Sequence, residues 1–99
     1  MAWMFDQQPN VACITSKKVI TGAPVLVATH YEDDHSWAFL DGAEFDPVNA
    51  MVVAMSTVLE LHPELHELAP MVQPGWSASR VGIGHPWEVQ RDHWEPDDA

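Results

Sequence analysis

The sequence predicts an α+β fold, in which a small antiparallel sheet carries one main helix and one short helix packed on one face. Three short apolar segments with strand-like alternation come first, a long apolar stripe with helical spacing follows, and another alternating segment comes later. This order is typical of α+β domains. We expect a single domain over residues 11–90, preceded by a lead-in over residues 1–10 and followed by an acidic tail over residues 91–99.

Three strands are expected in the first half of the chain. Residues 10–15 alternate weakly between polar and apolar side chains. Residues 25–30 are apolar on both faces, which is typical of a strand in the interior of a sheet. Residues 37–40 place Trp37 and Phe39 on one face, with smaller side chains between and after them.

The main helix is predicted over residues 47–61. Asp46 suits the N-cap, and Pro47 suits the first helical position, where the missing N–H is no loss. Apolar residues recur along one helical face: Val48, Met51, Val52, Met55, Val58 and Leu59. Pro63 ends this helix and can open a second, short helix that runs through Leu68.

The signal weakens beyond Pro70. Residues 76–81 alternate and are predicted to form a fourth strand, and residues 86–90 fit either a short strand or an extended segment. Residues 91–99 contain four acids, a proline and no apolar pattern beyond Trp94, so we expect this tail to fray.

The charge balance of the chain is strongly acidic. Four Lys and Arg face fifteen Asp and Glu, for a formal net charge of −11. Such a chain repels phosphate backbones, which argues against nucleic acid as a partner and fits a basic protein surface. The alternative is that the acidity only keeps the protein soluble.

The cysteine usage and the absence of long apolar runs bear on the compartment. Cys13 is the single cysteine, so no intrachain disulfide forms, and its apolar neighbours predict a buried, inert thiol. The first residues lack the basic and apolar regions of a signal peptide, and no segment is long enough to span a bilayer. We expect a cytoplasmic protein with no membrane partner.

The histidines and the Ser36 region are the candidate sites of chemistry in this sequence. His62 and His66 are four apart, as in some zinc sites, but Pro63 separates His62 from the helix of His66. Ser36 lies too close in sequence to its acidic and histidine neighbours to form a catalytic triad with them. We therefore expect no enzyme activity, no cofactor and no bound metal.

The five tryptophans suggest a binding surface. Trp37 is explained by its strand, whereas Trp3, Trp76, Trp87 and Trp94 lie in segments of weak periodicity. Tryptophan is enriched at protein interfaces, although the same side chains can also fill the edges of a thin core.

The run from Ala12 to Ile20, with Asp34, Trp37, Phe39, Gly42 and Glu44 after it, resembles the bacterial immunity protein 33-like domain. The resemblance covers roughly residues 11–80. His30, His35 and Ser36 stand where that family prefers Arg, Ser and Gly, and His62-Pro63 replaces an Asp-Pro step. The resemblance implies a protein that neutralises a cognate toxin by binding it, without chemistry of its own.

Three functions follow as expectations. The first is a non-enzymatic, immunity-like protein that binds a basic protein toxin through the following residues: Asp33, Asp34, His35, Trp37 and Trp76. The second is a small-ligand-binding or enzymatic domain that uses His30, Asp34 and His35. The third is a structural or oligomerising module without a ligand.

Overall fold

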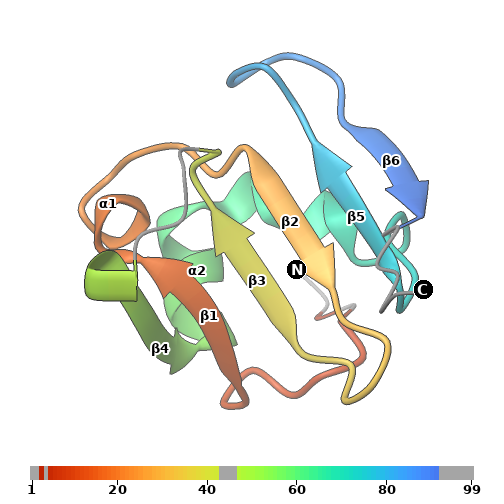
Figure 1. Cartoon of the computed structure of the whole chain (residues 1–99), viewed down its shortest axis with the longest axis horizontal. Helices are drawn as coiled ribbons and strands as arrows, with labels where there is room; N and C mark the ends of the chain where they lie inside the picture. The colour runs from red at the N-terminus through yellow and green to blue at the C-terminus, as the bar shows by residue number, and fades with distance from the viewer. Residues whose placement is uncertain (1–2, 4, 43–46, 92–99) are drawn as a thin grey trace, which may run out of the picture.

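The computed structural model describes residues 3, 5–42 and 47–91, which form a mixed six-stranded sheet with helices behind it (Figure 1). The strands follow the spatial order β4-β1-β3-β2-β5-β6. Their bounds are β1 (Ala12–Ser16), β2 (Val27–His30), β3 (Trp37–Leu40), β4 (Ala50–Ala54), β5 (Trp76–Ser79) and β6 (Glu88–Arg91). The helical segments are α1 (Lys17–Ile20), η1 (Pro47–Asn49), α2 (Met55–Leu61) and η2 (Pro63–Leu68). The α+β content agrees with the sequence prediction.

The sheet is not antiparallel throughout, so that part of the prediction is wrong. β1 pairs with β3 in parallel, with Ile14 opposite Ala38, whereas the other pairings are antiparallel. The cause is the route of the chain between β1 and β3. After β1 the chain passes through α1 and returns in β2, and the β2–β3 hairpin then lays β3 between β2 and β1. Two reversals of direction leave β3 parallel to β1.

The predicted helix over residues 47–61 is also wrong in its first half. Only Met55–Leu61 is α-helical, and Ala50–Ala54 is the edge strand β4, paired with β1. The run of apolar and β-branched residues there suits a strand as well as a helix, and β1 offers it an unpaired edge. In consequence Val48 and Val52 are 76% and 71% exposed, whereas Met55 is fully buried. Asp46, the predicted N-cap, lies outside the described residues.

Other elements follow the prediction more closely. The strand over residues 37–40 has the predicted bounds, β2 lies in the interior of the sheet, and the short helix after Pro63 is the 3-10 helix η2. β5 lies within the predicted fourth strand, and β6 occupies the segment that fitted either a strand or an extended chain. The helix α1 was not predicted; Ser16 caps it by accepting from the Val19 N–H. Of the predicted tail only Arg91 is described, and it is the last residue of β6, opposite Trp76, so the domain extends one residue beyond the predicted boundary.

The core fills the space between the sheet and the helices α2 and η2. It is built from Trp37 and Phe39 on β3, Cys13 on β1, Ala28 on β2 and buried residues of the helices, among them Met55, Val58, Leu59, Leu65 and Leu68. The lead-in belongs to this core, because Phe5 is buried and its ring meets Trp37 edge-on, with centroids 5.0 Å apart. Among the described residues no helix is both long enough and apolar enough to cross a membrane.

Candidate functional site

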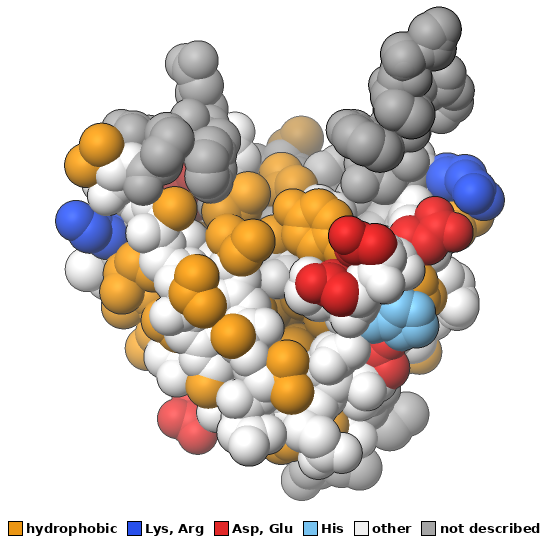
Figure 2. Space-filling view, turned by 60° about the horizontal axis from the view of Figure 1, so that its bottom comes forward, with side chains coloured by type: hydrophobic (Ala, Val, Ile, Leu, Met, Phe, Trp, Pro, Cys, Tyr) orange, Lys and Arg blue, Asp and Glu red, His pale blue; other side chains and the backbone are white. Residues whose placement is uncertain are grey.

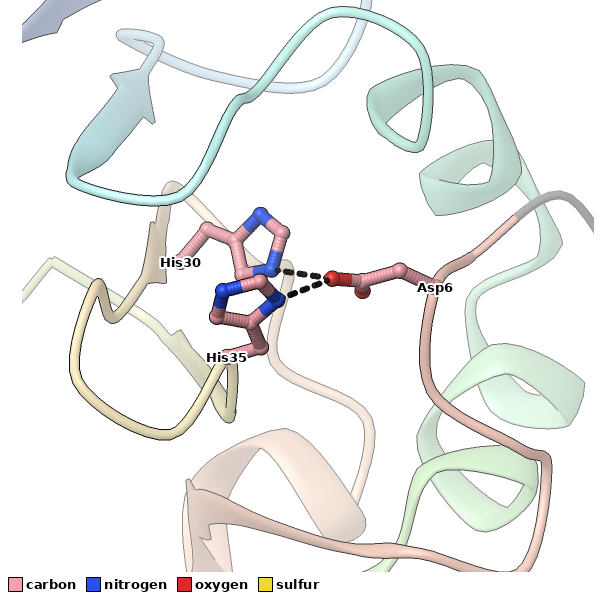
Figure 3. Close-up of side chains that lie close together, drawn as sticks. All are labelled: Asp6, His30 and His35. Carbon is pink, nitrogen blue, oxygen red and sulfur yellow. Dashed lines mark hydrogen bonds and ion pairs between the residues drawn. The ribbon is translucent and has the colours of Figure 1, made fainter.

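Two histidines and an aspartate converge at the end of the β2–β3 hairpin (Figure 3). His30 is the last residue of β2, His35 lies in the loop before β3, and Asp6 comes from the N-terminal segment. Asp6 Oδ2 lies 3.1 Å from His30 Nε2 and 3.1 Å from His35 Nδ1. We call Asp6, His30 and His35 the histidine–aspartate cluster. Among the described residues, this is the group whose potential ligand atoms all lie within 4.8 Å of one another.

His30 is held rigidly from two sides. Its side chain is only 4% exposed, and its Nδ1–H donates to the carbonyl oxygen of Val72 at 2.9 Å. Its ring stacks on that of Trp37, with centroids 4.1 Å apart and planes 19° from parallel. Because a carbonyl oxygen only accepts, the bond to Val72 places a proton on Nδ1 and leaves Nε2 to face Asp6.

Asp6 is positioned by the aromatic residues around it. The buried Phe5 ties the segment to the core, and the Trp3 indole N–H donates to the Gln7 carbonyl oxygen at 2.6 Å. The indole N–H of Trp37 lies 3.4 Å from Asp6 Oδ1, which leaves Oδ2 to the two histidines. The carboxylate stays partly in water, with its side chain 38% exposed.

The loop 31–36 has a defined turn geometry. The Tyr31 N–H donates to the Ser36 carbonyl oxygen at 2.8 Å, and Asp34 Oδ1 accepts from the Ser36 N–H at 3.0 Å. The hydrogen bonds that Ser36 donates to the Asp34 carboxylate hold the pKa of Asp34 below its ordinary value. His35 has a φ of 61°, a left-handed backbone conformation that residues other than glycine seldom adopt. This loop conformation places the His35 ring beside the Asp6 carboxylate.

A second loop supports the first from the β5 side. The Gly75 N–H donates to the His30 carbonyl oxygen at 2.7 Å, directly before β5 begins at Trp76. Gly75 has φ of +87°, and a side chain there would meet the Glu32 carboxylate at 3.1 Å. The backbone angle favours glycine at this position, whereas the exposed Glu32 side chain could shift by the few tenths of an ångström that a Cβ would require.

The five residues predicted to bind a partner have different surroundings. Asp33, Asp34 and His35 are exposed in the loop, and Trp76 is half-buried at the same end of the sheet. Trp37 is fully buried, so it supports the loop from behind and offers no surface to a partner.

The alternative constellation of His30, Asp34 and His35 is only partly brought together. The two histidines meet, but the Asp34 carboxylate accepts from the Ser36 N–H within its own turn. The acid that lies beside both histidines is Asp6, not Asp34. Asp6 is 24 residues from His30 in the sequence and lies in the predicted lead-in. The neighbouring Trp3 and Phe5 were the available signal, since large apolar side chains there indicate that the segment docks on the core.

His62 and His66, the histidine pair with the spacing of some zinc sites, have a structural role. His62 is buried rather than exposed, and its Nε2–H donates to the Val19 carbonyl oxygen at 3.0 Å. His66 meets the ring of Trp3 edge-on at 5.6 Å, and its Nδ1 is buried without a hydrogen-bond partner in the structure. These two side chains are packed into the protein and do not form a ligand pair.

The surface around the loop combines charge with apolar area. Figure 2 shows acidic side chains and a histidine gathered together, beside a stretch of hydrophobic side chains. In the loop the acids are Glu32, Asp33 and Asp34, and Tyr31 at its start is 36% exposed.

Comparisons of the chain with models of protein families, with curated proteins and with solved structures found no match.

Proposed function

We propose that this chain is a non-enzymatic binding protein that engages a basic protein partner through the loop 31–36. The observation that carries the proposal is an exposed acidic loop held in one conformation by buried groups beneath it. Loops that carry function on a rigid scaffold are the usual location of binding residues.

The first support is the order of the loop. Its tip is closed by the hydrogen bonds of Ser36, and its two ends continue into His30 and Trp37, which stack on each other inside the protein. A loop that is already ordered loses little conformational entropy when a partner binds, so more of the contact energy contributes to affinity.

The second support is the arrangement of charge. Glu32, Asp33 and Asp34 are consecutive and exposed, in a chain whose formal net charge is −11. Such a surface accelerates encounter with a cationic protein, and salt weakens the effect. The partly exposed Tyr31 adds an aromatic side chain, a residue type enriched at protein interfaces.

The resemblance to the immunity protein 33-like domain supports a particular kind of partner. In that reading the partner is a basic protein toxin, and this chain acts by covering the toxin's active surface in the cytoplasm. The histidines at positions 30 and 35 then belong to the scaffold of the binding loop and do not perform chemistry on a substrate.

The test compares two double variants with equal loss of charge. Glu32→Gln with Asp33→Asn removes two charges from the loop and leaves the Asp34 cap intact. Glu60→Gln with Glu88→Gln removes two charges from exposed positions outside the loop. Association with the product of the neighbouring gene is measured by surface plasmon resonance at low and at high salt.

We expect the loop variant to associate at least several-fold more slowly than the control variant at low salt, and the difference to shrink at high salt. Equal rates for the two variants, with both proteins folded, would place the binding surface elsewhere. The absence of binding by the unmodified chain would remove the neighbouring product as the partner.

A further inference from the structure

The histidine–aspartate cluster has the composition of a metal site. Two imidazole nitrogens and one carboxylate oxygen are the ligand set of several catalytic zinc sites, and the same set binds other divalent first-row metals. We propose that Asp6, His30 and His35 bind one divalent transition-metal ion of the Zn²⁺ class, through Oδ2, Nε2 and Nδ1 respectively. Three protein ligands leave a further coordination position open to water or to another ligand.

The distances suit such an ion. In a tetrahedral zinc site with Zn–N bonds of 2.0–2.1 Å, neighbouring ligand atoms lie about 3.3 Å apart. Here Asp6 Oδ2 lies 3.1 Å from each of the two histidine nitrogens, and all three atoms fall within 4.8 Å of one another. The Asp6 and His35 side chains are 38% and 49% exposed, so both are free to adjust around an ion.

The two hydrogen-bond partners of His30, both of them oxygen acceptors, point independently to a cation. Its Nδ1 must carry a proton, because it donates to the Val72 carbonyl oxygen. In the neutral ring Nε2 then carries a lone pair and can only accept a hydrogen bond. It faces a carboxylate oxygen of Asp6, which likewise can only accept. The contact is favourable only when Nε2 gains a second proton or when a cation lies between the two atoms.

The surroundings of His30 are those of a metal-binding histidine. Metal-bound imidazoles commonly donate their other ring N–H to a backbone carbonyl, which fixes the tautomer and the ring orientation. The Val72 carbonyl does this for His30, and the stack on Trp37 locks the ring plane. The Trp37 indole N–H near Asp6 Oδ1 in turn orients the carboxylate. His30 and Asp6 are therefore both oriented by residues outside the set of proposed ligands.

The proposed site differs from the sequence prediction of no bound metal, which concerned His62 and His66. It involves different residues, and one of them, Asp6, was not a candidate in the sequence. It shares His35 with the loop 31–36, but metal binding is measured on the isolated chain, so a failure of the metal site and a failure of the partner surface are distinguishable.

The test uses the full chain without a histidine tag, dialysed against a chelator and titrated with Zn²⁺ by isothermal calorimetry. We expect one ion per chain. Histidine-ring ¹⁵N spectra should show coordination at Nε2 of His30 and at Nδ1 of His35. The remaining described histidines, His62, His66 and His85, should keep their ring shifts.

His35→Ala and Asp6→Asn are expected to weaken zinc binding by about tenfold or more each, since even residues outside the ligand set have effects of this size. His85→Ala is the matched control, because it removes an exposed histidine far along the chain from the cluster. Circular dichroism checks that each variant is folded.

Three outcomes would overturn the proposal. The first is no saturable zinc binding by the unmodified chain. The second is unchanged affinity in folded His35→Ala and Asp6→Asn. The third is zinc binding whose ring shifts are confined to His62, His66 or His85.

Discussion

The imidazole of His30 stacks on the indole of Trp37 across the β2–β3 pair, with the ring centroids 4.1 Å apart. One face of Trp37 thus supports the cluster, and its ring also stacks near Phe39 in the core, with centroids 5.6 Å apart. The same side chain therefore connects the stability of the domain to the geometry of the site.

Trp37→Ala should lower the free energy of unfolding by about 4 kcal/mol, the usual size for truncating a fully buried tryptophan. Trp76→Ala should cost clearly less, because Trp76 is only half-buried and part of its ring is already in water. Urea denaturation of the two variants provides the comparison. Equal losses would show that Trp37 contributes no more to the core than Trp76 does.

Met55→Asp and Val52→Asp distinguish the strand β4 from the helix that was predicted there. Met55 is fully buried on α2, so an unpaired carboxylate at this position should cost about 3 kcal/mol or more. Val52 is 71% exposed on an edge strand, so the same change should cost less than about 1 kcal/mol. Thermal or urea unfolding measures both. A severe loss in Val52→Asp would contradict the strand, because a helical stripe buries both residues.

The Cys13 thiol should be unreactive in the folded protein. Burial raises its pKa from the ordinary 9.0 to about 12, so the thiolate is scarce at neutral pH. A thiol-specific reagent should modify Cys13 slowly in the native protein and quickly in denaturant. Because the folded pKa is raised, this thiol's contribution to stability is complete below pH 9 and is lost as the pH rises from 9 toward 12. Rapid native labelling at pH 8 would show that β1 opens readily.

His35→Gly should be more stable than His35→Ala by about 1 kcal/mol. His35 has φ of 61°, an angle that glycine adopts freely and alanine does not. Both variants lose the imidazole, so their difference isolates the backbone. Urea unfolding measured in the presence of a chelator keeps metal binding out of the comparison. Equal stabilities would show that position 35 relaxes to an ordinary backbone angle once its side chain is removed.

Several features of this protein were determined by short-range sequence patterns. Alternation defined the strand over residues 37–40, and two apolar faces placed β2 in the interior of the sheet. Pro63 opened the short helix η2, and the apolar neighbours of Cys13 indicated its burial. Each of these depends on residues within a few positions of one another, where backbone preference and side-chain spacing act directly.

The tertiary structure decided the features in which distant segments choose their partners. Residues 50–54 suit a helix or a strand by their spacing, and the free edge of β1 made them a strand. The parallel pairing of β1 with β3 and the meeting of Asp6 with His30, 24 residues away, likewise depend on how the whole chain packs. A local pattern does not contain this information, because the energy of a strand pair or a ligand cluster belongs to two segments at once.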